Sequence, residues 1–440
     1  MRICVIGVGY VGLVTAACLS DLGNEVVCVD NNKKKIRTLQ RGEIPFYEPG
    51  LKELVAHNLR NKRLSFISDL TIAVNKAKII FVAVGTPPKS TGEADVTAVI
   101  NVAKGIAQSI KSKATKYQKN DLGYKIIVNK STVPVGMGDL VTETLLKYGI
   151  PEENFAVVSN PEFLREGSAV SDFRSPDRLV IGASDNKAFN LITDLYRPLN
   201  AHIVFTSIKN AELIKYASNA FLATKISFVN ELANICERLG ADIIEVASGM
   251  SLDKRIGGAF LSAGIGFGGS CFPKDISALI HLAKSQGYEP VLLKSANELN
   301  RRLRKIFVDK VEKKIQNLKN KTVGVLGLSF KPQTDDLRDA PSLDIIAGLQ
   351  AKGAKVKVYD PVAMNAAKKV LRGAIFCKDA YQTAAGSHAL LIVTEWNEFK
   401  ELDLNRVKNS MKTPIVVDGR NIYDPRRMRE MGFDYTGTGR

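Results

Sequence analysis

Residues 257–275 bring together the residue types needed for nucleophilic chemistry at a carbonyl carbon. The segment holds six glycines and a single cysteine, Cys271, which Lys274 and Asp275 follow closely. Pro273 predicts a helix that begins near it, so Cys271 would lie at a helix N-terminus, about one turn before Asp275. A thiol beside a lysine at a helix N-terminus is favoured to ionise, and the thiolate attacks carbonyls. The alternative is a buried core cysteine after a flexible turn, which the glycines and the adjacent charges disfavour.

A second candidate site lies at the N-terminus, where Gly7, Gly9 and Gly12 form G-x-G-x-x-G between an apolar strand and a helical pattern. A second apolar strand then ends at Asp30. The glycines allow a tight turn and the approach of a pyrophosphate to a helix N-terminus, while the acid accepts from ribose hydroxyls. We predict a dinucleotide site made of Gly7, Gly9, Tyr10, Val11, Gly12 and Asp30. The acid favours NAD, and the lysines of residues 33–35 leave NADP as a minor alternative.

Polar residues follow later strands of the same predicted sheet, at residues 78–84, 124–128 and 155–159. Because ligands of such sheets bind beyond the carboxyl ends of the strands, Thr86 and Thr132 are candidates for contacting the cofactor or orienting water. Threonines that only form turns before proline fit the local pattern equally well. The third strand leads to two carboxylates and an arginine, Glu162, Glu166 and Arg165, where a general base would be useful.

A long helix is predicted over residues 209–239, because apolar residues recur there with helical period. It would span about 45 Å, enough to join two domains or to pair with a copy of itself. Lys215 and Asn219 lie four residues apart and share one face, although a lysine on a helix is usually exposed to solvent. The predicted buried stripe comprises Leu213, Ile214, Ala217, Phe221, Ile226, Val229, Leu232 and Ala233.

The last third of the chain repeats an alternating strand and helix pattern. A strand from residue 321 runs into a glycine turn, and residues 355–359 form a second strand that ends at Asp360. Further strands are predicted at 390–394 and 414–418. Since the glycines of the first motif are not reproduced, we expect a different nucleotide here, with Lys331, Arg338 and Arg420 available for phosphates.

Composition excludes several classes of protein. The 440 residues carry a formal charge of +17, but the basic clusters lack the interleaved aromatics and zinc spacings of nucleic-acid modules. No apolar run could span a membrane and no signal sequence precedes the first motif, so we expect a cytoplasmic protein without a membrane partner. The six cysteines show no C-x-x-C pair, Cys4 and Cys28 fall in apolar strands, and the four histidines lie far apart, so no metal is expected.

Together these motifs resemble the UDP-glucose/GDP-mannose dehydrogenase family along nearly the whole chain. The resemblance rests on the N-terminal glycine motif with Asp30, Lys130-Ser-Thr-Val-Pro, Asn160-Pro-Glu-Phe-Leu-Arg-Glu-Gly, Asn219 in its context, and Gly266-Phe-Gly-Gly-Ser-Cys-Phe-Pro-Lys-Asp275. It implies two Rossmann-like doubly wound parallel-sheet domains joined by a central helical segment with one long helix. The implied domains are 1–199 for NAD, 200–300 for dimerisation and the catalytic loop, and 301–440 for the UDP-sugar, in a homodimer or dimer-based oligomer.

The resemblance also implies a reaction, the four-electron oxidation of the C6 alcohol of UDP-glucose to a carboxylate with two NAD⁺. Cys271 would form a thiohemiacetal and then a thioester. Lys215 and Asn219 would stabilise the oxyanion, Asp275 would position water or take protons, Glu162 would act as base in thioester hydrolysis, and Thr132 would help to place water. GDP-mannose or a UDP-N-acetylhexosamine stays an alternative substrate.

The family correspondence extends to residues that contact each ligand. For NAD it implies Asp30, Lys35, Thr86, Thr132, Glu166, Lys274 and Arg338. For the UDP-sugar it implies Glu162, Phe163, Leu164, Arg165, Glu166, Lys215, Asn219, Arg255, Phe260, Leu261, Ser262, Ala263, Gly264, Gly268, Phe330, Lys331 and Arg420. Rival hypotheses are a single-hydride hydroxyacid dehydrogenase, which needs no cysteine, and a non-catalytic NAD-sensing or nucleic-acid-binding protein.

Overall fold

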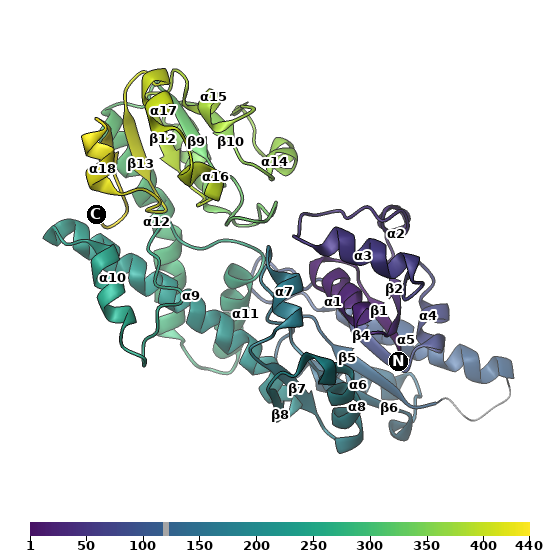
Figure 1. The fold of residues 1–440 in the computed structure, drawn as a ribbon. Helices are drawn as coiled ribbons and strands as arrows, with labels where there is room; N and C mark the ends of the chain where they lie inside the picture. The colour runs from purple at the N-terminus through teal and green to yellow at the C-terminus, as the bar shows by residue number, and fades with distance from the viewer. Residues whose placement is uncertain (118–122) are drawn as a thin grey trace. The chain divides into compact units, whose positions relative to one another are not determined.

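A computed structural model describes residues 1–117 and 123–440 of the chain, and it divides into two compact units, Met1–Ser218 and Asn219–Arg440 (Figure 1). Each unit contains one β-sheet with helices on both faces. In the described part of the chain, no helix is both long and apolar enough to cross a membrane.

The first unit is built on an eight-stranded sheet with the strand order β3-β2-β1-β4-β5-β6-β7-β8. All neighbouring strands are parallel except β6 and β7, which are antiparallel, so the predicted parallel sheet is confirmed with one reversed edge. The strands are β1 (Arg2–Ile6), β2 (Glu25–Val29), β3 (Leu64–Ile67), β4 (Ile79–Val82), β5 (Lys125–Asn129), β6 (Phe155–Ser159), β7 (Leu179–Ala183) and β8 (Ile203–Thr206).

Helices cover both faces of this sheet because alternate side chains of the buried strands point to opposite sides. The core on one face, which includes Val5 and Cys28, lies under α1 (Tyr10–Asp21), α2 (Lys33–Gln40), α3 (Leu51–Arg60), α7 (Ala169–Arg174) and α8 (Asn186–Tyr196). The core on the other face, which includes Cys4 and Ile80, lies under α4 (Leu70–Lys76), α5 (Thr97–Tyr117) and α6 (Met137–Lys147). The prediction that Cys4 and Cys28 are core residues is therefore confirmed.

The second unit begins within a helical segment and continues into a six-stranded parallel sheet. The helices are α10 (Ile243–Ser251), α11 (Phe272–Ser285) and α12 (Val291–Ile315). The sheet order is β11-β10-β9-β12-β13-β14, from β9 (Thr322–Leu326), β10 (Lys355–Tyr359), β11 (Ile375–Phe376), β12 (Ala389–Ile392), β13 (Ile415–Asp418) and β14 (Asp434–Thr436). One face packs on α12, α13 (Pro341–Ala351) and α14 (Met364–Val370), and the other on α15 (Ala380–Ala384), α16 (Asn397–Lys400), α17 (Leu404–Ser410) and α18 (Pro425–Glu430).

The predicted long helix is α9 (Ile208–Leu239), whose 32 residues run through the point at which the two units divide. The buried stripe predicted for it was partly wrong. Leu213 and Phe221 are 43% and 66% exposed, and Ala217 is exposed as well. Val229 and Ala233 of the predicted stripe are buried, but so are Ala211, Tyr216, Ala220 and Ala223 and several polar residues, because helical period alone does not say which stripe meets a neighbour.

Candidate active site

The glycine motif forms the tight turn between β1 and α1 that was predicted for a pyrophosphate. Gly7 has φ +94°, and a Cβ on Gly12 would lie 1.8 Å from the carbonyl oxygen of Gly7, so both positions require glycine. A Cβ on Gly9 would meet nothing within 4 Å, and the N-terminus of α1 has no side-chain cap. Open space beside uncapped N–H groups fits the negatively charged pyrophosphate of a dinucleotide.

Asp30 stands directly after β2 and ties its strand to the glycine turn. Its Oδ2 accepts from the backbone N–H of Val8 at 3.1 Å and pairs with Lys35 Nζ at 3.1 Å, while Oδ1 accepts from the N–H of Asn32 at 2.9 Å. A carboxylate has further acceptor positions, so these contacts are compatible with ribose hydroxyls. Lys35, predicted near NAD from the family correspondence, is thus the lysine that reaches Asp30.

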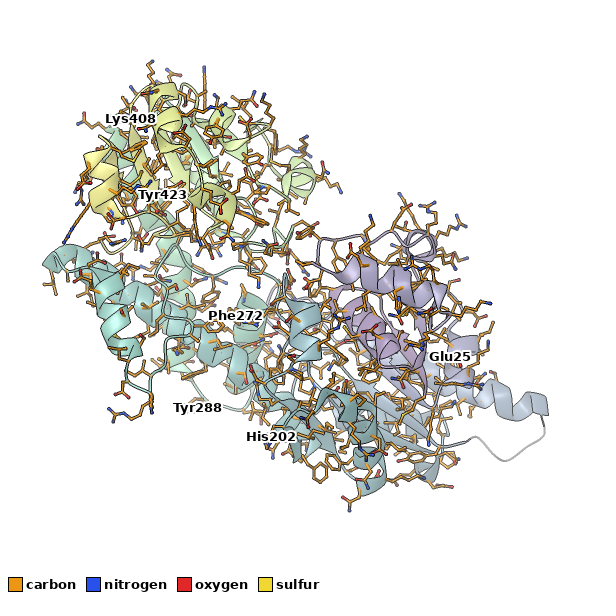
Figure 2. All side chains as sticks on the ribbon, in the orientation of Figure 1. Glu25, His202, Phe272, Tyr288, Lys408 and Tyr423 are labelled. Atoms are coloured by element: carbon orange, nitrogen blue, oxygen red, sulfur yellow. The ribbon has the colours of Figure 1, made fainter. Side chains whose placement is uncertain are left out.

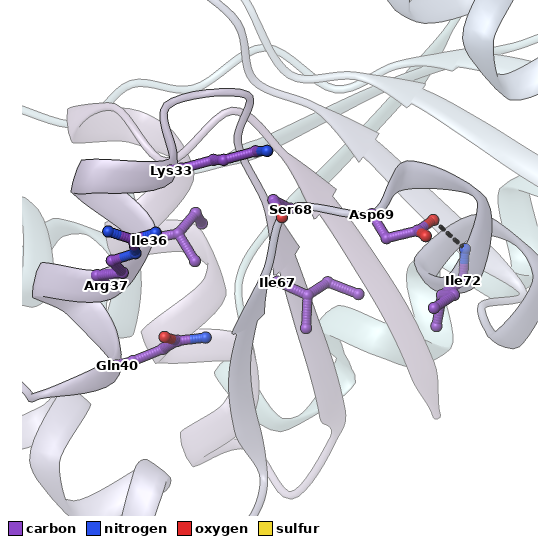
Figure 3. A pocket seen from close by; sticks show the side chains of 8 residues that line it. All are labelled: Lys33, Ile36, Arg37, Gln40, Ile67, Ser68, Asp69 and Ile72. Atoms are coloured by element: carbon purple, nitrogen blue, oxygen red, sulfur yellow. Dashed lines mark hydrogen bonds between the residues drawn. The ribbon is translucent and has the colours of Figure 1, made fainter.

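The neighbouring Lys33 belongs to a different feature, a cavity of about 410 Å³ between α2 and the start of α4 (Figure 3). At its rim, Asp69 caps α4 by accepting from the N–H of Ile72 at 3.0 Å. None of the predicted catalytic, cofactor or substrate residues lines this cavity. The lining residues are Lys33, Ile36, Arg37, Gln40, Ile67, Ser68, Asp69 and Ile72.

The structure brings together the two threonines predicted at neighbouring strand ends. Thr86 is buried, and its hydroxyl donates to the carbonyl oxygen of Thr132 at 2.8 Å. Ser131 reinforces this contact by donating to the carbonyl oxygen of Val84 at 2.6 Å. Because β4 and β5 are adjacent and parallel, their carboxyl ends meet at one edge of the sheet.

A buried ion pair joins Glu162, just after β6, to Lys215 on α9, with Oε1 and Nζ 3.2 Å apart. The other carboxylate oxygen of Glu162 accepts from the N–H of Leu164 at 2.6 Å. Phe163 lies over both cations of this region, with its ring centroid 5.3 Å from Lys215 Nζ and 3.9 Å from the guanidinium of Arg178. Lys215 is therefore not the solvent-exposed lysine that helical position usually predicts, and in a buried setting its charge acts strongly.

Lys130 is a second buried lysine in this part of the first unit. Its ammonium donates to Asn160 Oδ1 at 3.1 Å, and Tyr196 donates to the same oxygen at 2.7 Å. Burial lowers the pKa of Lys130 to about 8, an effect that the charge of Glu162 opposes and that of Lys215 reinforces. Glu162 therefore lies in a positively charged, buried environment.

In the second unit, Cys271 is the N-cap residue of α11, which begins at Phe272 with Pro273 in its first turn. It is the half-buried cysteine of the chain, whereas the other five are buried. One turn later, Asp275 is buried and accepts from Asn219 Nδ2 at 2.6 Å and from Lys274 Nζ at 2.5 Å. The predicted helix start and the Cys271 to Asp275 spacing agree with the structure, and the ammonium of Lys274 is bound by Asp275.

The glycine-rich loop before Cys271 packs against loops that follow the strands of the second sheet. A Cβ on Gly264 would lie 2.8 Å from the carbonyl oxygen of Gly419, and one on Gly268 would lie 2.3 Å from that of Asp339. A Cβ on Gly269 would lie 2.8 Å from the ring of Phe330. At these positions glycine allows protein backbone and ring to approach, a packing role that the sequence interpretation, which assigned the glycines to a ligand, did not foresee.

The guanidinium of Arg420 lies beside the predicted substrate residue Phe330 and pairs with Glu395, whose Oε2 is 3.2 Å from Nε. Nε donates to the carbonyl oxygen of Val393 at 2.8 Å, and the two Nη groups lie 3.4 Å from the carbonyl oxygens of Gly266 and Phe330. Lys331 Nζ stands 5.6 Å from the ring centroid of Phe330. Two cations and one aromatic ring thus occur beside the glycine-rich loop, a combination suited to a base and its phosphates.

Other predicted contacts lie in varied settings. Arg165, Arg255 and Arg338 are exposed and form ion pairs with Asp172, Asp253 and Asp336, which are close to them in the sequence. Phe260 has φ +66° and its ring centroid lies 6.3 Å from that of Phe272, which is labelled in Figure 2. Leu261 and Ala263 are buried in a small core with Val229, Ser262 is exposed, and Val11 and Glu166 are half-buried.

Three polar residues that hold predicted site segments in place, each within its own unit, were missed by the sequence interpretation. Asn230 accepts from the N–H of Gly264 at 2.7 Å. Asn300 bonds both backbone groups of Phe267, at 2.8 Å and 3.0 Å. Glu48 accepts from the N–H groups of Gly167 and Ala169. The available signal was weak, a polar residue within an apolar helical stripe for the asparagines and a carboxylate before Pro-Gly for Glu48.

Comparison with known proteins identifies the family. Residues 1–200, 209–302 and 324–425 match the NAD binding, central and UDP binding domains of the UDP-glucose/GDP-mannose dehydrogenase family. The chain belongs to this family. The matches confirm NAD as the cofactor, whereas the domain boundaries drawn at residues 199 and 300 stay a prediction.

Members of the family are similar to this chain over its full length. It is 49% identical to the UDP-glucose 6-dehydrogenase TuaD of Bacillus subtilis, covering 100% of this chain and 93% of the relative. It is 43% identical to the UDP-glucose 6-dehydrogenase of Pseudomonas aeruginosa, covering 100% and 98%. The solved structure of a UDP-glucose dehydrogenase from Pyrobaculum islandicum superposes with a TM-score of 0.91 at 38% identity, covering 99% of this chain and 97% of that one.

Proposed function

We propose that this chain oxidises UDP-glucose to UDP-glucuronate, with two NAD⁺ reduced for each sugar. The observation that carries the proposal is Cys271 at the N-terminus of α11, one turn from the buried pair of Asn219 and Asp275. Relatives that match this chain over its full length are named UDP-glucose 6-dehydrogenases. A dehydrogenase that removes a single hydride from an alcohol has no need of such a thiol.

The thiol makes the second oxidation possible. Loss of one hydride and one proton converts the C6 alcohol to an aldehyde, which has no second hydride to give until a nucleophile adds. Attack by the Cys271 thiolate gives a thiohemiacetal, and loss of a second hydride gives a thioester. The glycine turn and Asp30 would hold NAD⁺, which would supply the hydride acceptor for both oxidations. Water then cleaves the thioester, which regenerates the thiol, so one alcohol, one water and two NAD⁺ yield a carboxylate, two NADH and three protons.

Lys215, Asn219, Asp275 and Glu162 are proposed to stabilise charge and move protons around these steps. Lys215 and Asn219 lie one turn apart on α9, and their cationic and amide donors suit an oxyanion on C6. Asp275, already bonded to Asn219 and Lys274, would hold a water or accept the thiol proton. Glu162 would act as base for hydrolysis, with Thr132 orienting the water.

The nucleotide is proposed to bind at the second sheet. Arg420 and Lys331 provide positive charge for the pyrophosphate, and Phe330 provides a ring on which the base can stack. In the glycine-rich loop, Gly264 lies against Arg420 and Gly269 against Phe330. GDP-mannose and UDP-N-acetylhexosamines are the competing substrates, and the names of the full-length relatives favour UDP-glucose over both.

A homodimer is proposed from the exposed face of α9. Leu213, Phe221, Phe228, Ile235 and Leu239 are exposed apolar side chains, and their spacing of seven, eight or four residues puts them on one side of the helix. Pairing with a second copy of the chain would bury these apolar side chains and so remove them from water. Phe221→Glu should therefore lower the mass measured by light scattering from that of a dimer toward that of a monomer, while Lys313→Glu, an exposed change on α12 outside this stripe, should leave it unchanged.

The deciding experiment counts NADH formed per sugar at limiting substrate, with UDP-glucose, GDP-mannose and a UDP-N-acetylhexosamine tested side by side. We expect two NADH from UDP-glucose and much slower turnover of the others. Cys271→Ser should bind both ligands yet lose turnover by a factor of about 10³ or more, because its hydroxyl is a poor nucleophile here. One NADH per sugar, or normal two-NADH turnover by Cys271→Ser, would refute the covalent route.

A further inference from the structure

A buried carboxylate outside the proposed catalytic groups joins two parts of the first unit. Glu48, in the connection between α2 and α3, is only 6% exposed. Its Oε2 accepts from the N–H of Gly167 at 2.6 Å and from the hydroxyl of Tyr10, and its Oε1 accepts from the N–H of Ala169 at 2.7 Å. In the sequence, Tyr10 lies 38 residues from Glu48, Gly167 lies 119 residues from it, and Ala169 lies 121 residues from it.

On one side, Glu48 supplies the cap that α7 lacks. The N-cap residue of α7, Ser168, makes no side-chain cap bond, so the first N–H groups of the helix need another acceptor. Gly167, at φ +83°, turns its N–H toward the same carboxylate. A buried carboxylate with two backbone donors is held in one position, because leaving any of these groups unpaired would be costly.

On the other side, Glu48 reaches the glycine turn proposed to hold the pyrophosphate. Tyr10 lies between Gly9 and Gly12 and is the first residue of α1. Burial and the neighbouring carboxylate of Glu48 raise the pKa of Tyr10 far above its ordinary value, so its hydroxyl stays a neutral donor to Glu48. Its oxygen in turn accepts from the N–H of Gly167 at 3.2 Å, which closes a three-membered network.

Gly167 ends the segment that starts with Glu162. The beginning of that segment is held by the Glu162 ion pair with Lys215 and by the Leu164 N–H bond to Glu162. Its end is held by Glu48 and Tyr10. The residues proposed for thioester hydrolysis and sugar binding therefore lie between two buried anchors, of which Glu48 is the one that also contacts the cofactor turn.

We propose that Glu48 is a positioning residue that holds the NAD-binding turn and the segment 162–167 in one fixed arrangement. It touches neither ligand in this proposal and acts through Tyr10 and Gly167. The part that concerns the sugar rests on the proposed function, whereas the part that concerns NAD⁺ stands without it.

The test is Glu48→Gln, which keeps the size but turns an NH₂ group toward backbone donors. We expect the Kd for NAD⁺, measured by titration calorimetry, to rise about ten-fold, and KM for UDP-glucose to rise by a similar factor, with a smaller change in kcat. Glu43→Gln is the matched control, since Glu43 precedes α3 as well but is exposed and pairs only with Arg41 at 3.1 Å. It should leave all three constants unchanged.

Tyr10→Phe separates positioning from simple helix capping. It removes the tie to the cofactor turn and leaves both N–H bonds of Glu48 to the α7 end. We expect a weaker Kd for NAD⁺ at an unchanged unfolding midpoint, and in the double variant an effect smaller than the sum of the two single effects, because both changes cut the same tie.

Two results would overturn the inference. One is a Glu48→Gln protein with a lower unfolding midpoint whose NAD⁺ Kd and sugar KM stay within two-fold of the parent, which would make Glu48 a cap only. The other is a change in the NAD⁺ Kd of the double variant that equals the sum of the two single effects. If Glu48→Gln does not fold, an unchanged NAD⁺ Kd in Tyr10→Phe would overturn the inference in its place. The two-NADH stoichiometry of the parent is measured first, so that failure of the proposed function is seen separately.

Discussion

The two sheets start with the same turn and then use it differently. Gly7 and Gly327 have φ of +94° and +96°, and each donates its N–H to the last residue of the neighbouring strand, Val29 or Tyr359, at 2.8 Å. Each neighbouring strand is followed by an aspartate that accepts from the residue after the glycine, at 3.1 Å for Asp30 and 2.8 Å for Asp360.

Beyond this shared frame the two aspartates differ in their partners. Asp30 is paired with the side chain of Lys35 near the surface. Asp360 is fully buried and also accepts from the N–H and hydroxyl of Ser329 and from the indole N–H of Trp396. In addition, α1 begins three residues after Gly7, whereas α13 begins only at Pro341. The second turn thus has neither a nearby helix N-terminus nor an available carboxylate, which explains why the same architecture need not bind a second dinucleotide.

The largest effect should come from Asp360→Ala. It would leave six backbone or side-chain donors of a buried site without their acceptor, so we expect a loss of about 3–5 kcal/mol in unfolding free energy. Urea unfolding followed by tryptophan fluorescence measures it, since Trp396 is the one tryptophan of the chain. A stable Asp360→Ala protein would show that the two aspartates are more alike than their partners suggest.

Glu212, a buried carboxylate of the first unit, should make the stability of the protein depend on pH. Glu212 accepts from the N–H groups of Gly136 and Gly138 at 2.7 Å and 2.8 Å, yet burial raises its pKa to about 7. The folded state then holds a proton that the unfolded state releases near its ordinary pKa, so stability should fall as pH rises from about 4.5 to about 7, by at most about 3 kcal/mol. Unfolding of Glu212→Gln from pH 5 to 8 should lack this slope, and an equal slope in both proteins would contradict the assignment.

Asp30→Ala should weaken cofactor binding, whereas Asp360→Ala should lower the free energy of unfolding. We expect NAD⁺ to bind about 10- to 100-fold more weakly, and preference over NADP⁺ to shrink, because Lys35 loses its partner and can meet a 2′-phosphate. The Kd values for both cofactors provide the measurement, with Asp21→Ala as a control on a carboxylate that pairs at the surface with Arg174. An unchanged NAD⁺ to NADP⁺ ratio would exclude Asp30 as its determinant.

The smallest effect on folding is expected at Gly9. Because a Cβ there meets nothing within 4 Å, Gly9→Ala should keep the unfolding midpoint of the parent while weakening NAD⁺ binding about ten-fold by crowding the pyrophosphate. Gly327→Ala, in the turn of the second sheet, is the contrasting change, since a Cβ there would lie 2.4 Å from that of Thr394 at a positive φ, so it should destabilise the protein instead. Equal losses of stability in the two variants would show that the turns of the two sheets do not differ in this way.

Local signals in the sequence were enough to predict most of the helices and strands named from it. β6 and β10 agree residue for residue with the predicted strands, and α11 begins beside Pro273 as expected. Strands β3, β7, β8, β11 and β14 were missed. β8 is only half-buried at the edge of the sheet, so its side chains lack a clear alternation of buried and exposed positions.

By itself the sequence determined features that depend on a few neighbouring residues. These are the glycine turn before a helix, the acid at the end of the next strand, and a cysteine one turn from an aspartate. The tertiary structure decided the partners of these groups. It buried Lys215 against Glu162, exposed Leu213 and Phe221, and packed Gly268 and Gly269 against the loop that carries Phe330. It also committed Asp360 to its own turn and tied Glu48 to Tyr10. The reason is physical: the burial and charge of a side chain depend on neighbours tens to more than a hundred residues away, which no local spacing records.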